Sequence, residues 1–369
     1  MSTTTTTTTT ETNTVAVMPG EDVLKAILGT NDNIINALDR NYVESFMKLT
    51  LSPGPSDPLD VAGARKWLED QYGPMPKTPQ AKRVRPEIEL AVEDVPIVYG
   101  EDKATFNIRV YTPQIKDASS GPVPAILAYH GGGWIHGHSS LEDDVFKFVA
   151  SETLSVVFGV DYRLAPEHPF PAPHDDSYKA LNYVVDNAAK YNVDTKRIAL
   201  WGCSAGGNLV AGVALRDARE HEVTRICHAS LLVPALCPPK VAPAILSVPT
   251  SAYSHFGSTG NPFLLSKADE TWEIFANGTE NLTNQYLAPL LATPEKNHCP
   301  MYVVAAAVDV LRDEAVAYSM AYRDAGIDVQ LEIVAGAPHG MLAATEAAVS
   351  KQYWRNQVRV FNTALHTTF

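Results

Sequence analysis

The sequence LWGCSAGGNL, residues 200–209, places Gly202, Ser204 and Gly206 in the spacing Gly-x-Ser-x-Gly. The apolar run before this spacing predicts a strand, and the pattern over residues 205–220 predicts a helix. A chain that passes so abruptly from strand to helix must be strained at the turn, and small neighbours let the two elements pass closely. The stretch therefore predicts a sharp turn that projects the Ser204 side chain beside the N-terminus of a helix.

Strands and helices alternate on both sides of this turn. The expected strands are residues 93–100, 104–113, 123–130, 154–163, 197–204, 229–236, 300–309 and 328–336, and the expected helices are residues 141–152, 174–190, 205–220, 313–326 and 347–365. The first two strands predict a hairpin across Glu101 and Asp102, and several later runs are apolar enough for strands buried on both faces. This order predicts an α/β fold with a mainly parallel central sheet and helices on both faces. Ligands of such sheets bind at the carboxyl ends of the strands.

The composition is that of a globular protein, with 45% hydrophobic and 19% charged residues. A net charge of −13 argues against nucleic acid or an anionic membrane as the main partner, because both require a basic surface. We find no secretory signal and no apolar stretch of the ~18 residues that a membrane span needs, so we expect a cytoplasmic protein. Four cysteines without Cys-x-x-Cys spacing predict no disulfide framework. Residues 1–14, which are rich in threonine, predict a disordered tail.

A serine is a weak nucleophile unless a base activates it and an acid orients that base. In a sheet of this kind, the acid and then the base are expected at the ends of later strands. Asp309 ends one such strand and His339 follows the next, so we predict Ser204, Asp309 and His339 as catalytic residues. Asp313 is a rival carboxylate, although we expect it to face into the following helix. Asp309 as a helix cap and His339 as a simple turn residue are the alternative interpretations.

Three consecutive glycines, Gly131, Gly132 and Gly133, follow the strand that ends near His130. Glycines in series fill no core and leave the main chain exposed. Attack on an ester carbonyl creates an oxyanion, which preorganised backbone N–H groups stabilise. We therefore predict that the three glycines and Ala205, the residue after Ser204, form an oxyanion hole. A flexible glycine loop is the alternative, but it does not explain the position of the glycines at this end of the sheet.

Five motifs occur along the chain in a fixed order: HGGGWIHG (130–137), DYRLAPEHPFPA (161–172), GCSAGGN (202–208), DVLRDE (309–314) and PHGM (338–341). With these motifs the chain resembles the hormone-sensitive-lipase family of α/β-hydrolases over about residues 85–365. The resemblance implies the same catalytic and oxyanion-hole residues, no cofactor, and structural supports at Asp161 and from Tyr162 to Glu167.

The resemblance also implies a cap over the site. It divides the chain into the tail at 1–14, an N-terminal helical cap segment at 15–84 and a catalytic domain at 85–369, with a cap insertion at about 238–285. Two helical patterns, at 21–39 and 57–72, fall within the cap segment, and the second has Asp60 or Ser56 as a candidate N-terminal cap.

The insertion is rich in aromatic residues, which are Tyr253, Phe256, Phe263, Trp272 and Phe275. They either line an apolar substrate pocket or pack the cap against the core, and the sequence leaves both interpretations open. Trp134, directly after the glycines, is a candidate substrate-binding residue. The chain departs from the family at Cys203, where aspartate is usual, and at Val310, where proline is usual. We expect the Cys203 side chain to point back toward the sheet and Ser204 to be the nucleophile.

These observations predict a serine carboxylic-ester hydrolase for small or medium-chain esters, with the deacetylation of a specialised metabolite as one form of that activity. Lyase or cyclase chemistry, acyl transfer and simple ligand binding use the same kind of pocket and remain alternatives. His136 and His138 lack a third ligand at suitable spacing, so no metal is expected. The expected partner is a small-molecule ester, with neither nucleic acid nor a membrane span, and the sequence is compatible with a homodimer.

Overall fold

The computed structural model describes residues 38–46, 60–72, 85, 87–115, 121–242 and 268–366. The predicted tail at 1–14, the helix predicted at 21–39 up to residue 37, and the aromatic residues Tyr253, Phe256 and Phe263 lie outside the described residues.

In the described part of the chain, one sheet has the strand order β1-β2-β4-β3-β5-β6-β7-β8. Its strands are β1 (Glu89–Tyr99), β2 (Ala104–Gln114), β3 (Val123–Tyr129), β4 (Val156–Asp161), β5 (Val193–Cys203), β6 (His228–Leu232), β7 (Met301–Val308) and β8 (Val329–Pro338). β2 pairs antiparallel with both β1 and β4, and the pairs from β4 to β8 are all parallel. The predicted hairpin and the mainly parallel sheet are confirmed.

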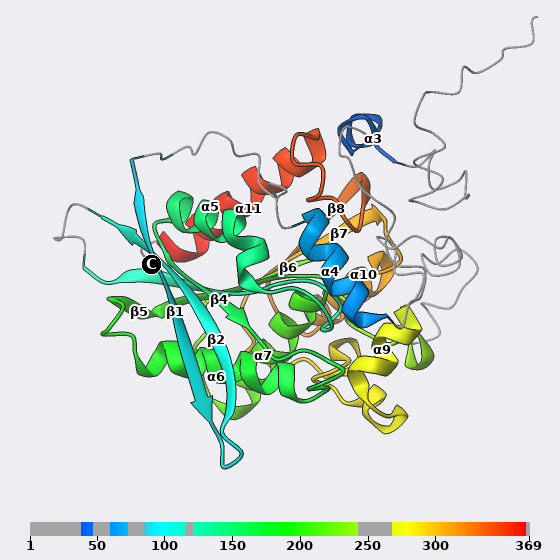
Figure 1. Ribbon diagram of the computed structural model, residues 1–369, viewed down its shortest axis with the longest axis horizontal. Helices are drawn as coiled ribbons and strands as arrows, with labels where there is room; N and C mark the ends of the chain where they lie inside the picture. The colour runs from blue at the N-terminus through cyan, green and yellow to red at the C-terminus, as the bar shows by residue number, and fades with distance from the viewer. Residues whose placement is uncertain are drawn as a thin grey trace, which may run out of the picture.

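Helices cover both faces of the sheet (Figure 1). Their bounds are α3 (Arg40–Phe46), α4 (Val61–Tyr72), α5 (Asp143–Thr153), α6 (Ala172–Asp186), α7 (Ala205–Glu220), α9 (Ala268–Ala276), α10 (Arg312–Asp324) and α11 (Ala348–His366). α5 and α11 pack on one face, in a core that includes Trp201, Tyr353 and Trp354. α6, α7 and α10 contribute to a larger core on the other face. The two cores explain why the central strands are apolar on both sides.

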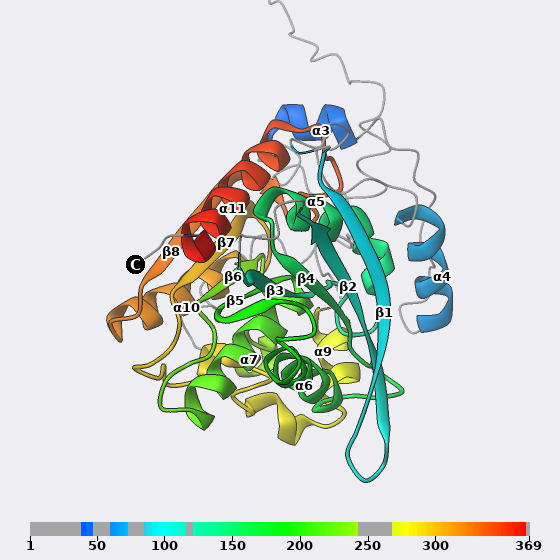
Figure 2. The ribbon, with the colours of Figure 1, turned by 90° about the vertical axis from the view of Figure 1, so that its left-hand side faces the viewer.

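The sheet is least buried at its β1 edge. All but one of the β1 residues are exposed or partly buried, and the β1–β2 hairpin extends beyond the body of the protein (Figure 2). The rest of the sheet, from β3 to β8, consists of parallel strands. The predicted site residues stand at the carboxyl ends of these strands. The functional part of the fold is therefore the buried parallel half.

Two helices of the N-terminal segment are described. α4 begins where Asp60 accepts a hydrogen bond from the Gly63 N–H at 2.7 Å. Asp60, one of the two candidates that the sequence offered, therefore caps this helix. α3 lies beside the start of α11, far from it in sequence (Figure 2).

The insertion before β7 is more regular than the sequence predicted. It contains α9 and short 3-10 helices at Thr279–Thr283 and Pro289–Leu291, none of which is among the expected helices. α9 buries Trp272 and Phe275, one helical turn apart, against the body of the protein. This spacing of apolar residues was the available signal for a helix.

Candidate active site

The turn between β5 and α7 holds Ser204 in strained backbone. Its φ of 57° and ψ of −117° lie outside the regions that ordinary residues favour. A Cβ atom on Gly202 would lie 2.2 Å from the carbonyl oxygen of Gly206, and one on Gly206 would lie 2.0 Å from that of Tyr129. Only glycine fits at either position, so the Gly-x-Ser-x-Gly spacing is required by the close passage of strand and helix, as predicted.

Backbone hydrogen bonds hold this turn on both sides. The Ser204 N–H donates to the carbonyl oxygen of Leu232 at 2.9 Å, and the Ser204 carbonyl oxygen accepts from the N–H groups of Asn208 and Ala235 at 3.1 and 3.2 Å. The Asn208 side chain donates to the carbonyl oxygens of Ala235 and Leu287, both at 2.8 Å. Asn208 is a supporting residue that the sequence analysis did not single out, although it stands in the GCSAGGN motif.

The structure brings the three predicted catalytic residues together. His339 Nε2 lies 2.9 Å from Ser204 Oγ, and His339 Nδ1 lies 2.9 Å from Asp309 Oδ2. Asp309 is fully buried, and Ser204 is 9% exposed. Ser204, Asp309 and His339 follow β5, β7 and β8, so the common carboxyl edge of parallel strands assembles the cluster from residues distant in sequence.

The same contacts bear on the rival and alternative interpretations of these residues. Asp313 forms an ion pair with the neighbouring Arg312 at 2.7 Å. Asp309 also accepts a hydrogen bond from the Leu311 N–H at 3.1 Å, so it supports the turn into α10 and contacts His339 at the same time. His339 is a turn residue as well, but its ring faces Ser204 and Asp309.

The glycine loop lies directly beside Ser204. A Cβ atom on Gly131 would be 3.7 Å from the Ser204 Cβ atom and 3.2 Å from the carbonyl oxygen of Cys203. Gly132 and Gly133 have φ values of 116° and 62°, which favour glycine. Ala205 is the first residue of α7, where backbone N–H groups have no partner within the helix. Gly131 and Ala205 thus lie next to Ser204, and Gly132 and Gly133 follow in the same loop.

Buried contacts fix the base of the glycine loop. The Tyr162 hydroxyl donates to the carbonyl oxygen of His130 at 2.8 Å, and the two rings stack with centroids 4.2 Å apart. Asp161 accepts a hydrogen bond from the Ser139 N–H at 2.5 Å. These residues act as the structural supports that the family resemblance implied.

Trp134 is 1% exposed and belongs to an aromatic stack. Its ring lies parallel to Phe275 with centroids 4.1 Å apart, and Trp272 packs against it at 4.4 Å. For Trp272 and Phe275, packing of the insertion against the core is the interpretation that the contacts favour. A role for Trp134 in substrate binding stays a prediction; its contacts in the described residues are those of a packing residue.

Cys203 packs toward the core that contains α5 and α11. Burial raises the pKa of its thiol above the usual value, and the charges of Glu142 and Asp309 raise it further. A protonated thiol is a poor nucleophile. The expectation that Cys203 points back toward the sheet agrees with these contacts.

An arginine that sequence reasoning missed ties α4 to the glycine loop. Arg65 donates from Nε to the carbonyl oxygen of Ile135 at 2.8 Å and from Nη2 to that of Ala165 at 2.9 Å. It also forms a two-pronged pair with Glu167, both contacts at 2.8 Å, which lowers the pKa of that carboxyl to about 2. On the same helix, Glu69 lies 2.9 Å from His138 Nε2. An arginine on a helical pattern gives no sequence signal for such contacts.

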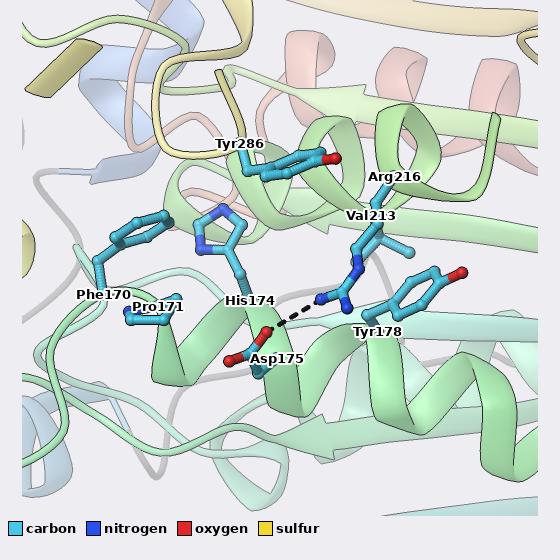
Figure 3. Close-up of a pocket in the computed structure, with 9 residues that line it drawn as sticks. Phe170, Pro171, His174, Asp175, Tyr178, Val213, Arg216 and Tyr286 are labelled. Atoms are coloured by element: carbon cyan, nitrogen blue, oxygen red, sulfur yellow. Dashed lines mark hydrogen bonds and ion pairs between the residues drawn. The ribbon is translucent and has the colours of Figure 1, made fainter. Parts of the chain in front are cut away.

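A separate small surface pocket lies between α6 and α7 and contains none of the predicted site residues (Figure 3). Its lining includes Phe170, Tyr286 and the buried His174. Arg216 and Asp175 also line it and form an ion pair with each other at 2.9 Å. Burial lowers the pKa of His174 to about 3, so this imidazole stays neutral. Among the described residues, no group of three or more histidine, cysteine, aspartate or glutamate side chains is arranged to hold a metal ion.

Comparisons with known proteins agree with this geometry. A family profile for the alpha/beta hydrolase fold matches residues 126–343. Carboxylic ester hydrolase LipN of Mycobacterium tuberculosis is 30% identical over 336 residues, which are 86% of this chain and 81% of LipN. Carboxylesterase NlhH of the same species is 31% identical over 313 residues, which are 82% of this chain and 89% of NlhH. The solved structure of a bacterial heroin esterase is 28% identical, has a TM-score of 0.73, and aligns over 90% of this chain and 99% of its own.

The fold and the arrangement of the site define an α/β-hydrolase. The chain belongs to the hormone-sensitive-lipase type of this family and is an enzyme of the carboxylesterase class. None of the helices described is both long and apolar enough to cross a membrane.

Proposed function

We propose that this protein hydrolyses small or medium-chain carboxylic esters through an acyl-enzyme formed on Ser204. The observation that carries the proposal is the unbroken hydrogen-bonded line from Ser204 Oγ through the His339 ring to Asp309, with both contacts at 2.9 Å. A nucleophile, a base and an orienting carboxylate in this order are the requirements of serine catalysis.

In the proposed first step, His339 Nε2 takes the proton from Ser204 Oγ as the oxygen attacks the ester carbonyl carbon. Asp309 holds the ring through Nδ1 and stabilises the imidazolium that forms. Negative charge develops on the former carbonyl oxygen, where N–H groups of Gly131 to Gly133 and of Ala205 stabilise it.

Collapse of the tetrahedral intermediate breaks the bond to the alcohol oxygen, which receives the proton from His339 and leaves as the alcohol. A water molecule then gives a proton to His339 and attacks the acyl carbon. The second collapse frees the carboxylic acid and returns the proton to Ser204. No cofactor takes part in this sequence.

The proposal includes a cap over the site, formed by the N-terminal helical segment and by the insertion before β7. Within the described residues, α4 is fixed to the glycine loop by Arg65, and α9 lies over it, because a Cβ atom on Gly133 would be 2.9 Å from the Thr271 methyl group. The aromatic stack of Trp134 with Phe275 adds a second contact between loop and insertion. The proposed substrate carries a small or medium acyl group, and the deacetylation of a specialised metabolite in the cytoplasm is one form that this activity takes.

The experiment is turnover of p-nitrophenyl esters from acetate to dodecanoate by the wild type and by Ser204→Ala and Cys203→Ala. We expect the highest kcat/KM at short or medium chains, a loss of at least about 1,000-fold in Ser204→Ala, and near-normal rates in Cys203→Ala. Product analysis with an added alcohol distinguishes hydrolysis from acyl transfer. Correctly folded protein without activity on any ester would exclude the proposal and favour lyase, cyclase or ligand-binding function.

A further inference from the structure

The loop that carries His339 contains a flexible link directly after the histidine. Residues 338–341 form a turn closed by a hydrogen bond from the Met341 N–H to the Pro338 carbonyl oxygen at 3.1 Å. His339 and Gly340 are the two central residues of that turn. Glycine restricts its own backbone less than any other residue, so the orientation of the turn depends on contacts from outside.

α3 and Asp39, the residue directly before it, supply three contacts on the two sides of His339. The Asp39 N–H donates to the carbonyl oxygen of Gly336 at 2.8 Å, before the histidine. The Tyr42 hydroxyl donates to the carbonyl oxygen of Gly340 at 2.9 Å, directly after it. The Ala348 N–H donates to the Asn41 side chain at 2.7 Å, at the start of α11.

The packing at Gly336 shows how closely α3 approaches this loop. Gly336 has a φ of 68°, and a Cβ atom there would lie 2.7 Å from the Asp39 nitrogen and 2.8 Å from its Cβ atom. Asp39 in turn accepts a hydrogen bond from the Tyr42 N–H at 2.9 Å, which caps α3. The contact at Gly336 therefore sets the position of the helix turn from which Tyr42 extends.

Tyr42 is well suited to hold one atom in place. Its side chain is 3% exposed and belongs to the larger core, so its ring has little freedom. Burial raises the pKa of its phenol above the usual value, so the hydroxyl keeps its proton as a donor. The Gly340 carbonyl oxygen also accepts from the Ala343 N–H at 2.9 Å, and the two donors together fix its direction.

We propose that Tyr42 is a positioning residue for His339: its hydroxyl holds the Gly340 carbonyl oxygen and thereby fixes the turn that aims the imidazole at Ser204. The inference rests on the proposed function, in which His339 is the base. It assigns the N-terminal segment a part in the geometry of the reaction in addition to covering the site.

The test compares Tyr42→Phe, which removes one oxygen atom, with Tyr183→Phe as the matched control. Tyr183 lies on α6 and shares a 2.9 Å hydroxyl contact with Tyr191, which follows the same helix, so the contact involves no residue of the His339 loop. Steady-state rates with p-nitrophenyl butyrate should show kcat reduced about tenfold in Tyr42→Phe with KM within twofold, because a misplaced base slows chemistry more than binding. Tyr183→Phe should retain the kcat of the wild type.

Two further measurements separate positioning from a general structural effect. The low-field proton resonance of the hydrogen bond between His339 and Asp309 should shift or broaden in Tyr42→Phe and stay unchanged in Tyr183→Phe. Gly336→Ala should displace α3 and lower kcat, and adding Tyr42→Phe to that variant should change kcat by less than about twofold, since coupled residues are not additive.

Wild-type kcat in Tyr42→Phe, or a loss confined to KM with the proton resonance unchanged, would overturn the inference. These outcomes are distinct from failure of the proposed function, because that failure appears as folded wild type without activity on any ester, or as full activity in Ser204→Ala. If Ser204→Ala is inactive while Tyr42→Phe behaves as the wild type, only the positioning role is lost.

Discussion

Arg65 on α4 and Ile135 in the glycine loop are joined by a 2.8 Å hydrogen bond from Nε to a carbonyl oxygen, although 70 positions separate them in the sequence. The same guanidinium reaches Ala165 and Glu167, so one side chain links the N-terminal segment to two loops beside Ser204. Guanidinium geometry suits this fork-like contact, and an ammonium group does not reproduce it.

We therefore expect Arg65→Lys to lower kcat/KM about tenfold, because the glycine loop loses a fixed anchor. The matched control is Lys66→Met on the same helix, where the pair with Asp70 is exposed and its loss should leave activity within twofold. Rates with a short p-nitrophenyl ester and the melting temperature of each variant test this. Equal activity in the wild type and Arg65→Lys would show that the anchor does not matter for catalysis.

The second prediction concerns the serine turn. Gly206→Ala places a methyl group 2.0 Å from the Tyr129 carbonyl oxygen, which is backbone and cannot rotate away. We expect a loss of about 3 kcal/mol in the free energy of unfolding, at the upper end for overpacking, together with loss of activity. Gly326→Ala is the comparison: nothing lies within 4 Å of the added atom, so only its φ of 88° should cost stability, about 1–2 kcal/mol, and activity should be kept. Denaturant unfolding measures both variants, and comparable losses in the two would contradict the steric explanation.

The third prediction compares two ion pairs with the same N–O distance of 2.9 Å, one with a fully buried carboxylate and one with a partly exposed carboxylate. Asp176 is fully buried and accepts contacts from Arg163 and from the Tyr99 hydroxyl. Arg163→Met leaves that carboxylate without its cation and should cost about 3–5 kcal/mol of unfolding free energy. Arg216→Met removes the partly exposed pairs with Asp175 and Glu220 and should cost about 1 kcal/mol or less. Chemical denaturation that ranks the two variants in the opposite order would refute this.

The fourth prediction is acid destabilisation by buried imidazoles. Burial lowers the pKa of His136, His228 and His298 to about 4 and that of His174 to about 3, from an ordinary value of 6.5. Between these values the unfolded chain binds more protons than the folded chain, so stability falls as the pH drops below 6.5. Each of these histidines should cost about 1 kcal/mol per pH unit in this range.

Melting temperatures at intervals from pH 7.5 to pH 4.5 measure this dependence. The decline should be steep below pH 6.5 and less steep in His298→Gln, which removes one of the four groups. A melting temperature that stays constant from pH 6.5 to pH 5 would show that these imidazoles are not kept neutral by the fold.

The sequence predicted the parts of the site that lie on strand ends. Gly202, Ser204 and Gly206 carry a local signature, and the order of Ser204, Asp309 and His339 follows from the topology of a parallel sheet. Alternation of apolar runs gave the strands from β3 to β8 because a strand buried on both faces has few polar positions. Asp60 was found because a helix cap is a local feature.

The contacts that sequence could not provide come from packing between distant segments. Tyr42 and Gly340 are 298 positions apart, and Asn208 is joined to Leu287 across 79 positions. A buried tyrosine or asparagine in a helix carries no mark of the carbonyl oxygen that it will contact. α9 was missed for a different reason. Trp272 and Phe275 have the spacing of a helix, but they were interpreted only as part of an aromatic-rich insertion.

The central claim is that Ser204 becomes acylated with His339 as its base. It is tested most directly by mass spectrometry of the protein after reaction with diethyl p-nitrophenyl phosphate, a reagent that traps serine nucleophiles activated by a neighbouring histidine. We expect one diethylphosphoryl group on the peptide that contains Ser204, and no labelling in Ser204→Ala or His339→Ala. Labelling of Cys203, or undiminished labelling in the His339→Ala variant, would contradict the account.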